Sequence, residues 1–166
     1  MPRTEEIVVN TGPLIALVAA LGDIRMLRIY RRVHVPFEVG QEIRTGGPAQ
    51  FAVSEFEAAH WLQKHPQTSR IAPVLLNTLD RGEAAVIQLA LDQNIQTVVI
   101  DEAAGRRVAR LNGLNVTGSI GILLRAQNEG LQFSIREAID RMTAQGIWLS
   151  DQVVAFALQE AGEIGD

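Results

Sequence analysis

Short apolar segments rich in β-branched residues alternate with segments of helical periodicity along this chain, and this alternation constrains the fold more than any other feature. The strand-like segments are Ile7–Val9, Val33–Val35, Thr97–Ile100 and Asn115–Thr117. Strands and helices that alternate in this way are typical of a parallel sheet covered by helices. The chain has 166 residues, which is the usual size of one domain. We therefore predict a single α/β domain over residues 1–166, with a central, mainly parallel sheet.

Helices are expected between these strands and after the last of them. The first predicted helix begins near Pro13. The others are predicted over Ile24–Arg32, Pro36–Thr45, Asp80–Asn94, Glu102–Asn112, Ser119–Asn128, Ser134–Gln145 and Ser150–Glu160. Gly46, Gly47 and Pro48 are expected to stop the third of them. The stretch from Gln50 to Pro73 gives the weakest signal, because Phe51–Leu62 fits either an amphipathic helix or an irregular pair of strands.

The charge and composition exclude several classes of protein. Nineteen acidic and fifteen basic residues give a net charge of −4, so any contact with nucleic acid has to be local. Cysteine is absent, which excludes disulfides and thiolate metal sites and is usual in intracellular proteins. The segment Met1–Glu6 is polar, and the longest apolar run, Leu14–Leu21, is far shorter than the ~20 residues that cross a bilayer. We expect a soluble cytoplasmic protein that does not enter a membrane.

Polar side chains fall where they can meet at one edge of the predicted sheet. Asn10 and Asp101 each follow an apolar strand directly, and the carboxyl ends of parallel strands line the crevice where ligands bind. Glu42 lies on the helix after Val33–Val35, and Glu83 lies in the first turn of the helix that begins at Asp80. Gathered together, these groups would repel one another, and Mg²⁺ or Mn²⁺ would relieve the repulsion. Such ions lower the pKa of water and stabilise a phosphodiester under attack, so hydrolysis of a phosphodiester is the natural reaction.

Each of these positions also has a structural interpretation. Asp80 and Glu83 have the spacing of a capping box, and Asp101 or Asn10 could be an ordinary N-cap. Glu42, four residues after Glu38, could belong to a solvated helix face. The functional interpretation is favoured because several such groups fall at strand ends or first turns within one sheet.

Two further sets of residues could support this site. Thr11 follows Asn10, and Ser119 follows Gly118 at a strand end, where its hydroxyl could be a cap or could hold a water. Three arginines follow Asp101 on one helix and could bind RNA phosphates or form a solvated face: Arg106, Arg107 and Arg110. The glycine-rich segments match neither a P-loop nor a dinucleotide fingerprint.

Five blocks of sequence resemble PIN-like domains, in the branch of small prokaryotic proteins related to VapC toxins. These blocks are IVVNTGPLIAL from Ile7, Val35–Pro36 with Val39 and Glu42, LDRGEAAVIQLA from Leu79, VIDE from Val99 with Arg106 and Ala109, and GSIGIL from Gly118. They occur in the family's order and cover most of the chain. The GEAAVIQLA and IDEAAGRRVA segments are the most specific.

The resemblance implies a three-layer α/β/α PIN-like fold and a metal-dependent ribonuclease of the toxin type. It also implies a homodimer that is inhibited by a small antitoxin protein. The family's four acidic positions fall on Asn10, Glu42, Glu83 and Asp101, and its supporting hydroxyl falls on Ser119. Asn10 departs from the family, which generally has aspartate there. An amide oxygen can bind a divalent ion but adds no charge, so metal affinity should be weaker.

Three functions are therefore compared. The first is a Mg²⁺- or Mn²⁺-dependent ribonuclease that uses these four residues. The second is a catalytically weak or inactive PIN-like scaffold that binds an antitoxin or RNA through the same groove. The third is a phosphoacceptor receiver-like domain, which needs a lysine after a late strand. Lys64 is the only lysine and precedes the strand at Thr97, so the third is disfavoured.

Overall fold

The computed structural model describes residues 5–46 and 51–163, in which five strands form one sheet. The strands are β1 (Glu6–Val9), β2 (Arg32–Val35), β3 (Gln63–Lys64), β4 (Thr97–Val99) and β5 (Asn115–Thr117). Their order is β3-β2-β1-β4-β5, and every neighbouring pair is parallel. Four of these strands are the predicted ones, and the mainly parallel sheet is confirmed as fully parallel.

The helices follow the predicted order closely. They are α1 (Thr11–Leu21), the 3-10 helix η1 (Arg25–Ile29), α2 (Phe37–Thr45), α3 (Val53–Ala58), α4 (Pro73–Leu76), α5 (Arg81–Asp92), α6 (Ala103–Leu111), α7 (Ser119–Asn128), α8 (Ile135–Ala144) and α9 (Asp151–Glu160). Several of these helices begin at the capping residues that the sequence predicts. The side chains of Asp80, Ser134 and Ser150 accept hydrogen bonds from the first turns of α5, α8 and α9.

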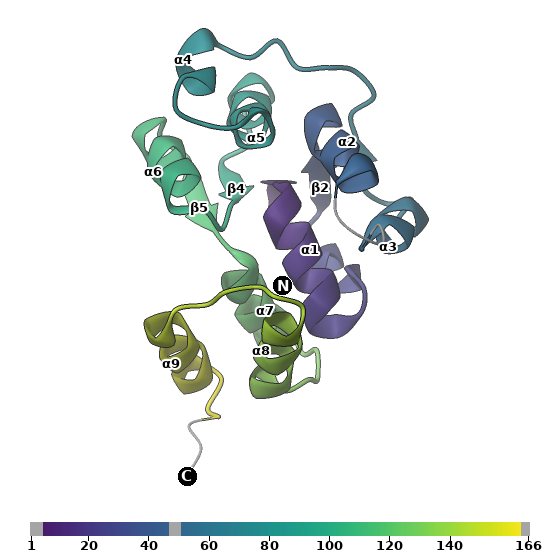
Figure 1. Ribbon diagram of the computed structural model, residues 1–166, viewed down its shortest axis with the longest axis vertical. Helices are drawn as coiled ribbons and strands as arrows, with labels where there is room; N and C mark the ends of the chain where they lie inside the picture. The colour runs from purple at the N-terminus through teal and green to yellow at the C-terminus, as the bar shows by residue number, and fades with distance from the viewer. Residues whose placement is uncertain (1–4, 47–50, 164–166) are drawn as a thin grey trace.

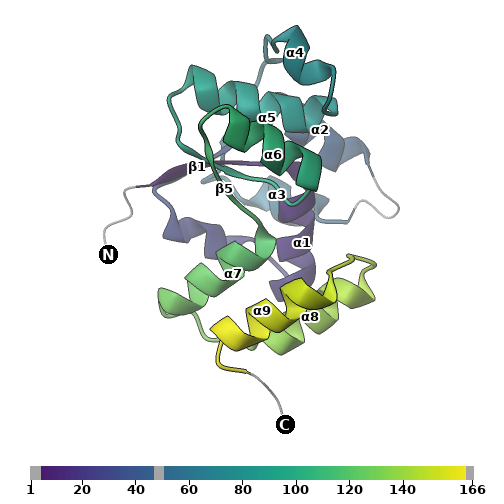
Figure 2. The ribbon, with the colours of Figure 1, turned by 90° about the vertical axis from the view of Figure 1, so that its left-hand side faces the viewer.

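The helices cover both faces of the sheet and give the three-layer α/β/α arrangement (Figures 1 and 2). Helices α5 and α6 lie on one face, where α5 contacts β1 and β4. Helices α1 and α7 lie on the other face, and α8 and α9 pack outside them. Helix α2 contacts both α1 and α5. Because both faces are covered, the central strands are apolar along their length: Ile7, Val8 and Val9 of β1 are completely buried.

The prediction of a helix over Ile24–Arg32 was wrong in type and in length. The chain forms a 3-10 helix from Arg25 to Ile29, Tyr30 is extended, and β2 already begins at Arg32. Strand β2 forms here because Arg32 and Val33 pair with Glu6 and Ile7 of β1, so Arg32 cannot belong to a helix. The predicted buried side is nevertheless confirmed, since Ile24, Leu27 and Tyr30 are all buried.

The region after α2 holds a short helix and the edge strand. Within the ambiguous stretch Phe51–Leu62, the structure has α3, so the helical alternative is confirmed in part. Strand β3 consists of two polar residues beside β2 and has no hydrophobic alternation that could have predicted it. Gly46 caps α2, while the predicted stop residues Gly47 and Pro48 and the start of the ambiguous region at Gln50 lie outside the described residues.

The C-terminal helices are fastened to the rest of the domain by α8. This helix packs along α1, and the Glu163 carboxylate accepts hydrogen bonds from the Ser134 hydroxyl (2.7 Å) and the Ile135 amide (2.6 Å) at its start. Glu163, three residues beyond the end of α9, thus caps the first turn of α8. Among the described residues, every helix is too short or too polar to span a bilayer.

Candidate functional site

The order in which the chain adds strands to the sheet reverses between β1 and β4. From β1 the chain proceeds to β2 and β3 on one side, and then crosses to β4 and β5 on the other side. The carboxyl ends of β1 and β4 therefore flank the switch point, where ligands bind in open α/β sheets. Asn10 follows β1, is buried, and its amide donates to Val99 O (3.0 Å). Strand β4 ends at Val99, so Asp101 is two residues beyond it rather than one, although Ile100 N still donates to Thr117 O.

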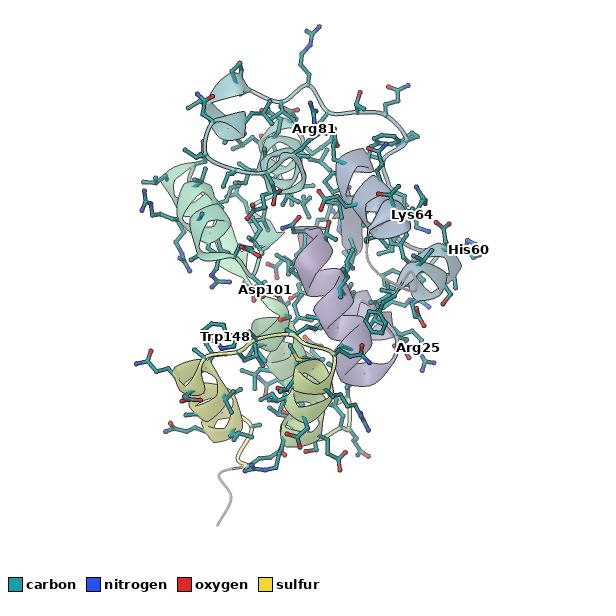
Figure 3. All side chains as sticks on the ribbon, in the orientation of Figure 1. Arg25, His60, Lys64, Arg81, Asp101 and Trp148 are labelled. Carbon is teal, nitrogen blue, oxygen red and sulfur yellow. The ribbon has the colours of Figure 1, made fainter. Side chains whose placement is uncertain are left out.

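Asp101 is an exposed carboxylate whose orientation is set by the start of α7. Its Oδ1 accepts a hydrogen bond from the amide of Ser119 (2.8 Å), which is itself buried. A Cβ atom at Gly118 would lie 2.5 Å from that oxygen, so only glycine allows this approach. Figure 3 shows Asp101 between α6 and the segment that carries Trp148. Asp101 is therefore fixed through one oxygen, and its side chain is otherwise open to solvent.

Glu42 of α2 reaches across to the starts of α1 and α5. The Thr11 hydroxyl donates to its Oε2 (3.0 Å), and a Cβ atom at Gly82 would lie only 2.0 Å from its Oε1. Partial burial of the carboxyl raises the Glu42 pKa, the nearby Asp80 charge adds to this, and the bond from Thr11 opposes it. The supporting residue Thr11 thus contacts one of the predicted acids directly.

Glu83 is buried at the start of α5, and its Oε2 has no hydrogen-bond partner among the described residues. Its amide donates to Asp80 Oδ1 (2.8 Å), so half of the predicted capping box is present. Its carboxyl, however, faces Gly105 of α6, where a Cβ atom would lie 2.7 Å from Oε2. Burial raises the pKa of Glu83 to about 7, and Asp80 contributes to the shift. Near neutral pH this carboxyl is therefore poised between its acid and its ionised form.

Sequence reasoning missed two features of this site. The sequence identifies Asp80 only as a helix cap, whereas in the structure its charge raises the pKa values of both Glu42 and Glu83. The second feature is a glycine opposite each acid, at positions 82, 105 and 118. The Gly82–Glu83 and Gly118–Ser119 pairs at helix starts were visible as sequence, but only the folded chain shows which carboxylate each glycine accommodates.

The three arginines of α6 have different roles. Arg106 is half-buried, and its Nη1 donates to Ile100 O (2.8 Å), so it braces the segment before Asp101. Burial lowers the Arg106 pKa, with a further contribution from Arg110. Arg107 and Arg110 are exposed, which leaves them available to a ligand.

The donor set suits a hard divalent cation, although the site is not preassembled. Oxygen atoms from Asn10, Glu42, Glu83 and Asp101 come from four elements around the switch point, and one Glu83 oxygen is buried without a partner. In residues 5–46 and 51–163, no three His, Cys, Asp or Glu side chains stand close enough together to form a finished metal site. The segments that carry these groups meet at one edge of the sheet.

The chain matches a known family of proteins. The family model DUF3368, described as a PIN domain, matches residues 6–163. Comparison with curated proteins gives no match. The match spans all five strands and the residues described above.

Proposed function

The chain belongs to the PIN-domain family, and from this premise we propose that it is a metal-dependent ribonuclease that hydrolyses RNA phosphodiesters. Membership of the family indicates a nuclease-type function. The observation that carries the more specific proposal is the buried Glu83 carboxyl, which has an unpartnered oxygen and an elevated pKa beside Asp80. Burial of an ionised carboxylate without a cation costs free energy, and such a carboxylate is typical of a site that binds a cation.

We assign Asn10, Glu42, Glu83 and Asp101 as the groups that hold Mg²⁺ or Mn²⁺. When bound, such an ion supplies an activated water and stabilises the charge that develops on the phosphodiester. The chain's own residues orient these groups. Thr11 positions Glu42, the Ser119 amide positions Asp101, and Arg106 holds the backbone at Ile100. Arg107 and Arg110 extend from α6 as contacts for RNA phosphates.

The test is cleavage of an RNA pool of structured and single-stranded molecules by the purified protein with Mn²⁺, with Mg²⁺ and with EDTA. We expect cleavage with metal and none with EDTA. Asp101→Asn should reduce it at least about a hundredfold, because the charge is lost while the acceptor for Ser119 remains. Asp140→Asn, an equal change at an exposed position of α8, is the matched control and should cleave like the parent. Metal-independent cleavage, or equal loss in both variants, would refute the proposal.

A second candidate is an inactive scaffold that binds RNA or an antitoxin through the same groove. It is favoured by Asn10, which lacks the charge of an acid, and by the net charge of −4, which disfavours extensive contact with RNA phosphates. A folded parent that fails to cleave RNA with either metal, together with an Asn10→Asp variant that gains metal-dependent cleavage, would establish this alternative.

We further propose that the protein is the toxin of a toxin–antitoxin pair, acts in the cytoplasm, forms a homodimer and is inhibited by a small antitoxin. The sequence offers two regions for a dimer face, the apolar first helices and the C-terminal helices. Helix α1 is largely buried beneath α8, whereas Trp148, Val153 and Phe156 before and on α9 are exposed. The exposed α9 surface is therefore the better support for a dimer, and the molar mass of wild type and Phe156→Glu in solution tests it.

A further inference from the structure

A small basic cavity lies at the edge of the sheet opposite the candidate site. It has a volume of about 110 Å³ and is lined by Arg28, Tyr30, Arg31, Arg32, Val33 and Trp61. Arg32 is the first residue of β2, η1 precedes that strand, and Trp61 precedes β3, so the cavity is at the amino ends of parallel strands. We call this cavity the arginine pocket.

The arginine pocket concentrates positive charge in a chain that is acidic overall. Three of its six lining residues are arginines and none is acidic, although the net charge of the chain is −4. Arg31 is paired with Glu6, which also contacts His34. Arg28 and Arg32 form no ion pair with any residue of the described ranges 5–46 and 51–163. Glu6 offsets part of this positive charge, since it pairs with Arg31 and its pKa is lowered by the hydrogen bond with His34 and also by the nearby charge of Arg32. A bound anion would offset the remainder and reduce the repulsion between the guanidinium groups.

The pocket also presents an aromatic face beside these charges. The Arg28 guanidinium lies over the Trp61 ring, 5.7 Å from its centroid, and Trp61 is half-buried. Stacking restricts the guanidinium while its N–H groups stay free to donate. Arginine binds phosphate oxygens through two parallel hydrogen bonds, and an exposed indole face stacks on nucleobases. A nucleotide unit carries both an anionic phosphate and an aromatic base.

We propose that the arginine pocket binds the phosphate of a nucleotide unit, with Arg28 and Arg32 as the phosphate ligands and Trp61 against the base. This site is distinct from the proposed cleavage site, because the two lie at opposite ends of the parallel strands. The same chemistry is offered by a free nucleotide and by a nucleotide within an RNA strand. If an RNA strand occupies it, the pocket is a second point of attachment that leaves the candidate active site open.

The test uses the fluorescence of Trp61. The chain has two tryptophans, so Trp148→Phe leaves Trp61 as the only one. This variant is titrated with AMP and with a cleavage-resistant 2′-O-methyl oligoribonucleotide, in EDTA so that metal and cleavage play no part, and inorganic phosphate serves as competitor. We expect a saturable change in Trp61 emission that phosphate reverses. Saturation by AMP assigns the pocket to free nucleotides, and saturation by the oligonucleotide alone assigns it to RNA.

Charge variants provide the matched comparison in the same background. Arg28→Gln or Arg32→Gln should weaken binding at least about tenfold, the effect of one lost hydrogen bond to a charged group. Arg25→Gln removes the same charge from the same helix η1, but Arg25 is paired with Asp23 (2.9 Å) and does not line the pocket. It should change affinity less than about twofold. No saturable signal with either ligand, or equal weakening by Arg25→Gln and Arg28→Gln, would overturn the proposal. Since no cleavage is measured, this result is independent of whether the protein is a nuclease.

Discussion

The two ends of the same parallel sheet place ionisable side chains in different environments. At the carboxyl end, Glu83 is buried and its pKa is raised to about 7. At the amino end, Arg28 and Arg32 stay exposed around a small cavity. A buried carboxyl can relieve repulsion by taking up a proton, whereas an arginine keeps its charge and has to find a counter-ion. From this difference we expect the carboxyl end to respond to pH and the arginine pocket to respond to salt and anions.

The strongest way to break this comparison is Glu83→Gln, which replaces the titrating group with a neutral one of equal shape. We expect Mn²⁺ affinity, measured by calorimetry, to fall at least about a hundredfold, because the buried charge that attracts the ion is lost. Glu137→Gln, an equal change at an exposed position of α8, is the control. Retention of Mn²⁺ affinity in Glu83→Gln would remove Glu83 from the metal site.

The second prediction concerns the pH dependence of stability without metal. The folded protein holds the Glu83 proton more tightly than the unfolded chain, because its pKa is about 7 rather than near 4.5. The contribution of this proton is therefore complete below about pH 4.5 and is lost as the pH rises to 7. Urea unfolding in EDTA should show a loss on the order of 2 kcal/mol between these limits. Glu83→Gln should flatten this part of the profile, and an unchanged slope in the variant would contradict the assignment.

A third prediction addresses the glycines that let the acids approach. Gly82→Ala should displace the Glu42 carboxylate, since the new Cβ would lie 2.0 Å from Oε1. Mn²⁺ affinity should fall about tenfold, while the free energy of unfolding should change by less than about 1 kcal/mol, because the end of a flexible side chain can move. Gly12→Ala is the matched control in the first turn of α1, where a Cβ meets no atom within 4 Å. Equal Mn²⁺ affinities in the two alanine variants would show that Glu42 does not bind the ion.

The smallest expected effect concerns Arg32, at the amino end of the sheet. Arg32→Gln should change the free energy of unfolding by less than about 0.5 kcal/mol, because the side chain is exposed and forms no ion pair within the described residues. The change should also be the same at pH 5 and pH 8, since arginine stays charged at both. Urea unfolding at the two values measures it, and a change that differs between them would link the amino end to a titrating group.

Most of the fold could be predicted because apolar strands and amphipathic helices carry strong local signals. The helix from Arg81 to Asp92 and the strand Glu6–Val9 are examples. Strand β3 could not be predicted, since two polar residues become a strand only through pairing with β2. The segment around Arg25–Ile29 failed for a similar reason, because pairing of Arg32 with β1 outweighs local helix preference.

For the candidate site, the sequence predicts that the polar residues gather at the carboxyl edge of the sheet, but it does not predict the strand order that makes this edge a switch point. Asn10 directly follows strand β1, and Asp101 lies two residues after the end of strand β4. The burial of Glu83 and the charge of Asp80 on its neighbours could not be foreseen, because they depend on how closely α5 approaches α2 and α6. The assignment of these residues as metal ligands stays a prediction.

The packing of α8 on α1 has a consequence for synthesis of the chain. Helix α1 ends at Leu21, but the helix that covers it begins only at Ile135, and the cap of that helix comes from Glu163. A ribosome adds about 5–20 residues per second, so the apolar surface of α1 waits on the order of ten seconds for its cover. During that interval the part of α1 that α8 later covers stays exposed to solvent, and exposed apolar surface of this kind favours aggregation.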